Sequence, residues 1–391
     1  MNKKSPLAVL FFTTFLDLVG FGIIIPILPN FAKDLGASAL EVGLLAAVYA
    51  LMNFLFSPFW GTLSDRIGRR PVIMYSVALT AVAHLIFSQS YTLAVLLISR
   101  ILAGVGSANI SAAQAYITDI SEPKNRTKSL GLIGAAFGLG FIFGPPLGGY
   151  VKDTFGFEWV GYVAGGLSFI NLILVYFFLP ESLKIKKPDT PFSFRPITNI
   201  YNALQKPLIR ELFLINFIYI AAFSMMQITA ALLWKEHSAL SDKEIGYVFA
   251  FIGVCSALIQ GVFVGKFNDR FGEKKLLVMG NISMAIGLFA MPFFNGDLFM
   301  PWEFVVLFLI ALSNGFVGPS LASLLSQKAN PGELGQTLGL NQSFGSLARV
   351  AGPTLGGFLY GIEFHLPYVF GAAILMFSLY LALTIFKERV S

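Results

Sequence analysis

The stretch "GTLSDRIGRRP" at residues 61–71 decides the fold, because it places a charged turn between two long apolar segments. Its glycines permit a sharp turn and a close approach of neighbouring backbone. A degraded copy, "GKFNDRFGEKK", returns at residues 265–275, where Glu273 replaces a basic residue. Four positions match at an offset of 204 residues, namely Gly61, Asp65, Arg66 and Gly68 with Gly265, Asp269, Arg270 and Gly272. Each copy follows the second apolar segment of its half, which indicates a duplication.

A second repeated motif supports the same division. "GPPLGG" at residues 144–149 returns as "GPTLGG" at residues 352–357, an offset of 208 residues, and each copy closes the fifth apolar segment of its half. Parallel repeats of this kind are one architecture of membrane transporters. We expect an N-terminal six-helix bundle over residues 1–183, a polar linker over 184–206 and a C-terminal six-helix bundle over 207–391.

The composition requires an apolar solvent. Of the 391 residues, 56% are hydrophobic and 12% are charged, with a mean hydropathy of +0.74, whereas soluble chains contain about 25% charged residues. The pattern predicts an all-α integral membrane protein with twelve spans. These spans are residues 7–29, 41–60, 71–89, 92–117, 128–151, 158–179, 208–233, 242–265, 275–296, 302–327, 334–360 and 366–386.

The distribution of positive charge predicts the orientation. With the N-terminus inside, 21 Lys and Arg residues face the cytoplasm, 4 face outward, and Arg100 and Arg349 lie within spans. This bias places both termini in the cytoplasm of a multi-pass membrane protein. It also explains the net charge of +6 without a nucleic-acid partner. Short loops are compatible with a bacterial inner membrane, and the single cysteine, Cys255, allows no intrachain disulfide.

Four motifs, all within residues 17–149, resemble the major facilitator superfamily. They are the loop motif at 61–71, "RILAGVGSAN" at 100–109, "GAAFGLGFIFGPPLGG" at 134–149, and "DLVGFGIIIPILP" at 17–29. The last resembles the first span of twelve-span drug:proton antiporters, which include tetracycline exporters. The resemblance implies the major facilitator fold, with two pseudo-symmetric six-helix bundles, and favours antiport.

The loop motif is interpreted as a cytoplasmic gate. The resemblance implies that it stabilises the outward-facing state through charge contacts, for which Asp119 and Glu122 are suitable partners. Retention of the loop in the cytoplasm is the simpler reading, but it does not explain Asp65 or the glycine spacing. The predicted gate residues are Gly61, Asp65, Arg66, Gly68, Arg69, Arg70, Asp119, Asp269 and Arg270.

The fifth span of each half contains glycine and proline where a helix can bend. Small residues also allow helices to pack closely in lipid, so static packing and bending both remain open. The predicted helix-bending positions are Gly144, Pro145, Gly148, Gly352, Pro353 and Gly356.

Ionisable groups at membrane depth are candidate functional sites. Asp17 lies near the middle of the first span, and Arg100 lies at a similar depth in the fourth, so both can line one cavity. We expect them to couple transport to proton movement. The alternatives are a fixed ion pair, or Asp17 bonded to Thr13, Thr14 or the backbone.

Other polar and soft side chains within the spans are candidates for substrate binding. An adaptable apolar pocket suits hydrophobic or amphipathic molecules, although polar residues in spans often serve only to join helices. The candidates are Asn53, Gln114, Phe223, Met226, Gln227, Asn314, Asn341 and Arg349.

The chain lacks a nucleotide-binding GxxxxGK[ST] motif, a metal-binding HExxH motif and a GxSxG nucleophile motif. We therefore expect no enzyme activity, no metal and no cofactor, with the proton gradient as the energy source. The predicted function is proton-coupled efflux of hydrophobic or amphipathic small molecules by alternating access, performed by a monomer in the lipid bilayer. The alternatives are a lipid transporter or flippase, proton-coupled uptake of a small metabolite, and a non-transporting membrane scaffold.

Overall fold

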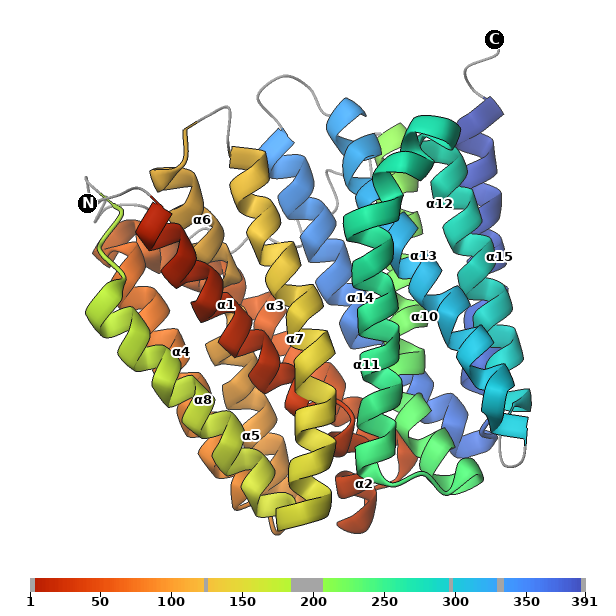
Figure 1. The fold of residues 1–391 in the computed structure, drawn as a ribbon, viewed down its shortest axis with the longest axis horizontal. Coiled ribbons are helices and arrows are strands. Elements are labelled where there is room, and N and C mark those ends of the chain that lie inside the picture. Colours follow the sequence, from red (N-terminus) through yellow and green to blue (C-terminus); the bar gives the residue numbers. More distant parts are fainter. Residues whose placement is uncertain (1–3, 123–125, 184–206, 295–297, 329–333, 388–391) are drawn as a thin grey trace. The chain divides into compact units, whose positions relative to one another are not determined.

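The structure, a computed structural model, describes residues 4–122, 126–183, 207–294, 298–328 and 334–387. The predicted linker over 184–206 lies outside the described residues. Within them the chain is helical and contains no strand (Figure 1). The first half contains α1 (Lys4–Ile24), α2 (Ile27–Asp34), α3 (Ala39–Ile67), α4 (Arg69–Ser88), α5 (Leu93–Gly106), α6 (Ile110–Ile120), α7 (Arg126–Phe155) and α8 (Phe157–Phe178). The second contains α10 (Pro207–Ser238), α11 (Asp242–Leu258), α12 (Val264–Ala290), α13 (Phe299–Lys328), α14 (Leu334–Ile362) and α15 (Leu366–Lys387).

The helices divide into two compact units that differ from the two halves of the sequence. Unit 1 contains residues 1–37, 48–194 and 241–250, and unit 2 contains residues 38–47, 195–240 and 251–391. The start of α3 therefore belongs to unit 2, and the start of α11 belongs to unit 1. In unit 1 we call the end at which α1 begins the near end, in unit 2 the end at which α15 finishes, and in each unit the opposite end is the far end.

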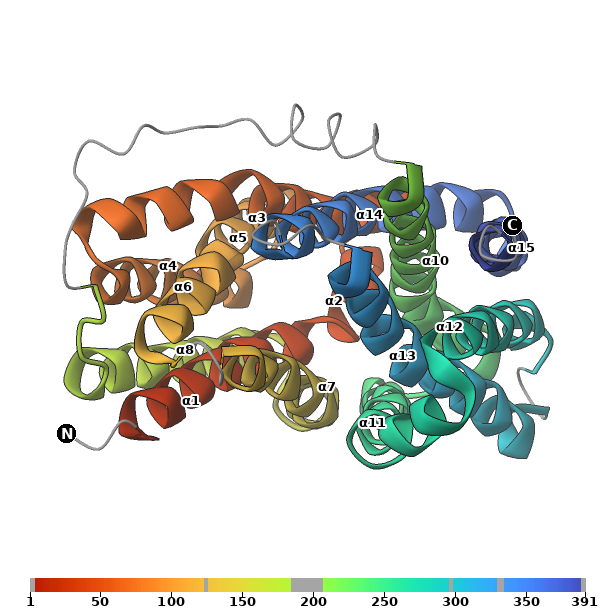
Figure 2. The same cartoon turned by 90° about the horizontal axis from the view of Figure 1, so that it is seen from above.

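In unit 1, α1 packs against α7 and α8, and α4 packs against α5 and α8 (Figure 2). The contact of α1 with α7 depends on the absence of side chains: a Cβ at Gly144 would meet the backbone of Gly22, and one at Gly148 would meet that of Ile23. α7 continues as one helix through Pro145 and Pro146. Close packing thus accounts for Gly140, Gly144 and Gly148, whereas a Cβ at Gly134 or Gly138 would meet no atom within 4 Å.

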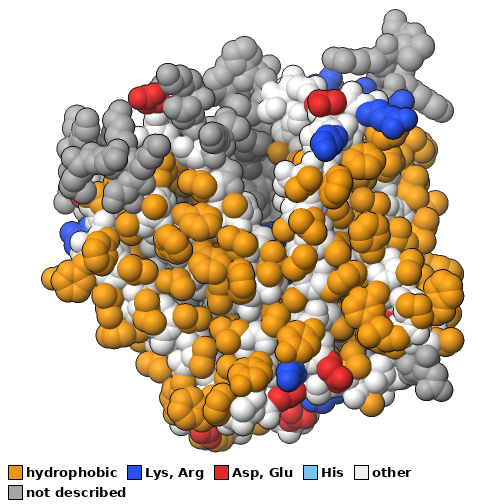
Figure 3. Space-filling view, in the orientation of Figure 1, with side chains coloured by type: hydrophobic (Ala, Val, Ile, Leu, Met, Phe, Trp, Pro, Cys, Tyr) orange, Lys and Arg blue, Asp and Glu red, His pale blue; other side chains and the backbone are white. Residues whose placement is uncertain are grey.

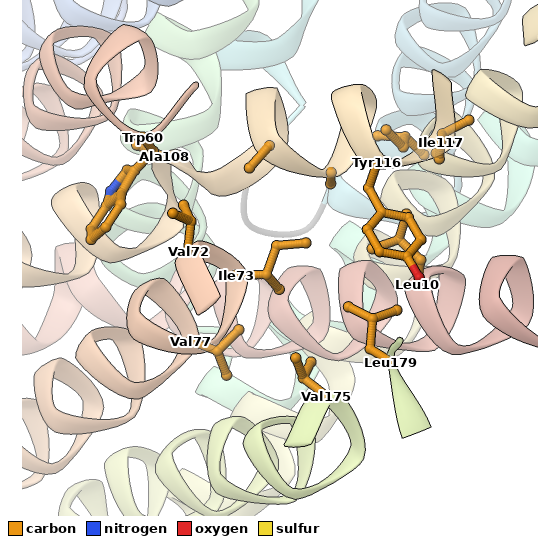
Figure 4. Packing of buried hydrophobic residues seen from close by; sticks show 13 residues of the cluster. Leu10, Trp60, Val72, Ile73, Val77, Ala108, Tyr116, Ile117, Val175 and Leu179 are labelled. Atoms are coloured by element: carbon orange, nitrogen blue, oxygen red, sulfur yellow. The ribbon is translucent and has the colours of Figure 1, made fainter. Parts of the chain in front are cut away.

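The near end of unit 1 has an apolar core that holds the loop motif in place. Leu10 of α1, Ile73 of α4, Tyr116 of α6 and Leu179 after α8 meet there, all at 2% exposure or less (Figure 4). Burial of a large apolar side chain contributes about 1.5–3 kcal/mol. This core fixes the helix ends that surround residues 61–71.

In unit 2, α10 packs against α14 and α15, and α12 packs against α13 and α15. Gly352 and Gly356 of α14 lie against Ala221 and Met225 of α10, as the glycines of α7 lie against α1. α11 runs into α12 through one π-helical turn, Ile259–Phe263. The break between the eighth and ninth spans falls at Gly272, whose φ of 77° favours glycine.

The helices have the length and composition of membrane spans. Among the described residues ten segments qualify, and one of them, Asp242–Phe293, covers two of the predicted spans. α14 is not among these segments, although its bounds agree with the predicted eleventh span. On the face drawn in Figure 3, hydrophobic side chains cover the middle of the helices and the charged ones lie mainly toward their ends.

Candidate functional site

The charged turn after α3 is held by an organised network in unit 1. The Arg69 side chain is 7% exposed and binds the carboxylates of Asp65 at 2.7 Å and Asp119 at 3.1 Å. It also donates to Oγ of Ser64 at 2.6 Å. Asp119 is one of the two partners expected for the loop motif, and the other, Glu122, is exposed. The network joins α3, α4 and α6 at the near end.

Glu181 is a further partner that the sequence reasoning missed. One of its carboxylate oxygens accepts from the backbone N–H of Arg69 at 3.0 Å, and the other accepts from that of Arg70 at 3.2 Å. These are free N–H groups of the first turn of α4, so the carboxylate caps the helix. Gly68 has a φ of 116°, and a Cβ there would overlap the Glu181 carboxylate. The glycine is therefore required for the cap.

The remaining residues of the turn have separate contacts. Arg70 donates to the carbonyl oxygen of Tyr176 at 2.5 Å and lies over its ring. Gly61 faces Ser111, which a Cβ would approach to 3.5 Å. Arg66 is half-buried.

The second copy of the turn has a different arrangement in unit 2. Glu273, at the position that is basic in the first copy, accepts hydrogen bonds from Ser323 at 3.1 Å and Gln327 at 3.4 Å. Asp269 and Arg270 are exposed, and the Arg270 guanidinium stacks over Phe271. The backbone break is repeated, but the buried arginine network is not.

Asp17 lies at the polar centre of unit 1, where two amide groups hold its carboxylate. Asn171 of α8 donates to Oδ1 at 2.8 Å, and Asn109 donates to Oδ2 at 3.1 Å. Asn109 also donates to Ser76 of α4. Asp17 therefore bonds neither Thr13 nor Thr14, although Asn171 joins it to the Thr13 carbonyl oxygen.

A small pocket brings Asp17 and Arg100 together. Arg100 is 3% exposed, lies over the Phe87 ring and has one terminal nitrogen without a hydrogen-bond partner among the described residues. No ion pair joins it to Asp17 within the described part of the chain, so the two charges share a cavity rather than a fixed contact. The lining residues are Asp17, Phe21, Ile24, Tyr49, Thr80, His84, Arg100, Ala103 and Ser107.

His84 lines this pocket as well, and it was not among the predicted site residues. It is 3% exposed and its Nδ1 lies 3.1 Å from Oγ of Ser168. A Cβ at Gly20 of α1 would lie 3.2 Å from its ring. Asp17, His84 and Arg100, from α1, α4 and α5, thus line one pocket. The signal that could have indicated His84 is a histidine within the predicted third span.

Among the described residues, the polar centre of unit 2 contains no acid. Tyr219 of α10 donates to Oδ1 of Asn314 at 2.7 Å and accepts from Ser313 at 3.2 Å. Asn216 donates to the backbone carbonyl of Asn341 at 3.1 Å. Gln227 has a buried amide nitrogen without a partner among the described residues. Asn314 therefore belongs to a neutral hydrogen-bonding group, and Asn341 takes part in one through its backbone carbonyl.

The other substrate-binding candidates are dispersed. Asn53 donates to Ser107 at 3.2 Å, beside the pocket of unit 1, and Gln114 is exposed on α6. In unit 2, Met226 is 1% exposed within the core, Phe223 is half-buried, and Arg349 is exposed on α14.

Two helix crossings at the far ends repeat the same backbone contacts. In unit 1, a Cβ at Gly149 of α7 would overlap the Asp242 carbonyl oxygen of α11. In unit 2, a Cβ at Gly357 of α14 would overlap the Ala39 carbonyl oxygen of α3. Neither α3 nor α11 can approach so closely unless glycine occupies the crossing.

The helices that enter these crossings begin with the same capping box. Ser38 and Glu41 cap α3, and Ser241 and Glu244 cap α11. The backbone N–H of the serine donates to the glutamate carboxylate, at 2.7 Å in α3 and 2.8 Å in α11. The backbone N–H of the glutamate donates to the serine hydroxyl, at 3.3 Å in α3 and 3.2 Å in α11. This reciprocal pattern satisfies the free N–H groups of a first helical turn. It is a third repeat, which short sequence motifs did not reveal.

The crossing in unit 1 also contains a buried ion pair. Lys152 of α7 lies 2.6 Å from Asp242, which is 4% exposed, and Asn30 of α2 donates to the same carboxylate at 3.0 Å. The backbone N–H of Lys243 donates to Asp153 at 3.0 Å. α2, α7 and the start of α11 are therefore joined by charge at the far end.

Comparison with known proteins places this geometry in a family. The family model of the Major Facilitator Superfamily matches residues 10–353 and, in a second match, residues 212–391. The chain is 30% identical to multidrug resistance protein 2 of Bacillus subtilis over 99% of its length and 96% of that protein. It is also 30% identical to the class C tetracycline resistance protein of Escherichia coli, over 97% and 96% of the two lengths. The crystal structure of the human organic anion transporter MFSD10 aligns with a TM-score of 0.75 and 24% identity, over 98% of this chain and all of that one.

Proposed function

Because the chain belongs to the major facilitator superfamily of membrane transporters, we propose that it is a proton-coupled exporter of hydrophobic or amphipathic small molecules. Its relatives of 30% identity are named as drug-resistance proteins, which supports export. The proton gradient supplies the energy, and the chain works as a monomer by alternating access. The near ends face the cytoplasm of a bacterial inner membrane in this proposal.

The observation that carries the proposal is the placement of Asp17. Its carboxyl group lies in a pocket with Arg100 and His84, bonded only to neutral amides among the described residues. An acid at membrane depth that is held by neutral donors can exist with or without its proton. Arg100, which shares the pocket without pairing to Asp17, favours the ionised form when it approaches. A change in their separation would therefore release or take up a proton.

The network around Arg69, at the near end of unit 1, supports the proposed change between conformational states. Arg69, Asp65, Asp119 and Glu181 hold the turn after α3 in one arrangement. Two charged contacts and a helix cap stabilise the state in which they form. Loss of this network shifts the equilibrium between states rather than removing the binding pocket.

The test is transport by purified protein in liposomes, with the cationic dye ethidium as the probe. In Asp17→Asn, ethidium flux driven by a pH gradient should fall by about tenfold or more, while exchange of ethidium at equal pH persists because the amide resembles the protonated acid. Asp34→Asn, which alters an exposed acid at the far end of unit 1, is the control. If Asp17→Asn retained the full pH-driven flux, Asp17 would be excluded as the coupling residue. If the flux of the wild-type protein were independent of the pH gradient, proton coupling itself would be excluded.

Organic anions are a second candidate class of substrate. The buried Arg100 has a terminal nitrogen without a partner in the described residues, which favours an acidic group on the ligand. The structural neighbour MFSD10 is named as an organic anion transporter. The same liposomes with carboxyfluorescein in place of ethidium test this class; flux of the anionic dye that requires Arg100 would favour it. Proton-coupled uptake of a small metabolite would appear as pH-driven flux of the metabolite in the opposite direction. Lipid translocation would appear as movement of a labelled lipid.

A further inference from the structure

The two far-end crossings are sterically alike on both of their faces. A Cβ at Gly246 of α11 would overlap the Pro145 carbonyl oxygen of α7, and a Cβ at Gly43 of α3 would overlap the Pro353 carbonyl oxygen of α14. These contacts complement those described above, in which the glycine belongs to α7 or α14. Steric fit therefore does not distinguish one crossing from the other.

Polar bonds distinguish them, because the first turn of α11 is fastened to unit 1. The buried carboxylate of Asp242 is bonded at both oxygens: Lys152 of α7 lies 2.6 Å from Oδ2, and Asn30 of α2 donates to Oδ1 at 3.0 Å. The backbone N–H of Lys243 donates to Asp153 of α7 at 3.0 Å. If α11 withdrew from this crossing, all three contacts would break, and separating a buried ion pair is costly.

The start of α3 has no such fastening in unit 2. Ser38 and Glu41 bond each other within the cap of α3. Among the described residues, no hydrogen bond or ion pair joins a side chain of residues 38–47 to α10 or α14. The bond between Tyr360 and Glu236 joins α14 to α10 and does not involve α3. The start of α3 can therefore leave its crossing without breaking a polar contact of this kind.

The far end of unit 2 does contain a buried acid, but it does not hold α3 either. Glu303, in the first turns of α13, is 0% exposed, and its Oε1 accepts a hydrogen bond from the indole N–H of Trp234 at 2.8 Å. This bond joins α13 to α10. In the described part of the chain no cation forms an ion pair with Glu303, so the charged fastening is a property of the crossing in unit 1.

We propose that Lys152 and Asp242 form a far-end latch of the transport cycle: their ion pair holds α11 against α7 in this structure and breaks when that crossing opens. The inference rests on the proposed alternating access, and it assigns the free-energy cost of far-end opening mainly to one of the two crossings. The glycines set how closely the helices can approach. The ion pair sets how much of the time the crossing of α7 with α11 is closed.

The first experiment measures hydrogen–deuterium exchange of the purified protein by mass spectrometry, without any substrate. The double variant Asp242→Ala, Lys152→Met removes both charges and leaves no unpaired lysine, so the protein should remain folded while the latch is absent. Exchange of the N–H groups in residues 241–250 should then rise by about tenfold, because the start of α11 detaches more often. Exchange in residues 38–47, at the start of α3, should stay at the wild-type rate.

Tyr360→Phe is the matched control, because it removes a polar bond at the far end of unit 2 and should leave the exchange of both segments unchanged. The proposal is overturned if residues 241–250 exchange at the wild-type rate in the double variant. It is equally overturned if both segments exchange faster to the same extent, since the ion pair would then stabilise the whole fold rather than one crossing.

The second experiment measures pH-driven flux of ethidium in liposomes. Arg69→Ala breaks the network at the near end, and the double variant breaks the latch at the far end, so each should bias the equilibrium toward an opposite state and lower the flux by about tenfold. The triple variant that combines them should recover the flux to within about threefold of the wild type, because the two biases cancel.

A triple variant as slow as the slower of its parents would contradict the latch. Wild-type flux independent of the pH gradient would overturn the proposed proton coupling instead. The latch would then stand or fall on the exchange of residues 241–250, which requires neither a substrate nor a gradient.

Discussion

The crossing of α7 with α11 and the crossing of α14 with α3 share their backbone contacts but differ in their polar chemistry. Gly149 and Gly357 occupy equivalent positions at an offset of 208 residues, and both leave no space for a side chain. At the same offset Lys152 corresponds to Tyr360. The first forms the buried pair with Asp242, and the second bonds Glu236.

The difference indicates which features of the duplicated chain are fixed by geometry. Close approach of two helices requires glycine in both copies, since any Cβ would overlap a carbonyl oxygen. Side chains around the crossing have no such constraint. One copy contains a buried ion pair, and the other contains a tyrosine hydroxyl bonded to an exposed glutamate. Three sets of substitutions, in decreasing order of expected effect, test this separation of steric and polar roles.

The largest effect is expected from breaking the ion pair of unit 1. Asp242→Ala leaves Lys152 with only the exposed carboxylate of Asp34 at 4.0 Å and should lower the free energy of unfolding by about 3–5 kcal/mol. The measurement is denaturant unfolding of the purified protein in detergent. The double variant Asp242→Ala, Lys152→Met should recover most of the loss, because no unpaired charge remains. A double variant as unstable as the single one would show that the pair is not the cause.

A smaller loss of stability should follow from placing a side chain in either helix crossing. Gly149→Leu and Gly357→Leu should each destabilise the protein by about 1–3 kcal/mol or more, because the helices must separate. Gly166→Leu is the matched control, since a Cβ at Gly166 meets no atom within 4 Å. Thermal unfolding of the three variants measures the effect. If one crossing tolerates leucine and the other does not, the steric equivalence of the two crossings is wrong.

The smallest effect is expected from the capping boxes. Ser38→Ala and Ser241→Ala each remove one reciprocal cap and should cost about 1 kcal/mol. Because the bond lengths are nearly the same, the two losses should be equal within error. Ser38→Thr and Ser241→Thr, which retain the hydroxyl, should recover most of the stability. A cost confined to Ser241→Ala would indicate that the cap acts through the adjacent ion pair.

Much of the fold could be predicted from local pattern. The apolar segments, the two charged turns and the repeated glycine motifs predict a duplicated helical membrane protein, and the family comparison confirms that fold. Asp17 and Arg100 were predictable as ionisable residues at similar depth. Their shared pocket confirms that they can line one cavity.

The rest depends on contacts between distant segments, which a single sequence does not reveal. Glu181 follows the sixth span and caps α4 after more than a hundred intervening residues. Asn109 and Asn171 are ordinary span residues until α1 places Asp17 between them. Glu303 stands at the start of a span, where a charged residue usually faces water. Only the approach of α10 reveals that it is buried.

The bond between Trp234 and Glu303 has a practical consequence. The chain has four tryptophans, and their indole groups have different neighbours: Trp60 donates to a backbone carbonyl, Trp234 donates to a carboxyl group, and Trp159 and Trp302 are exposed. Indole emission responds to nearby charge. With the other three tryptophans replaced by phenylalanine, the fluorescence of Trp234 would report the ionisation of its neighbour in real time, without a dye or a label.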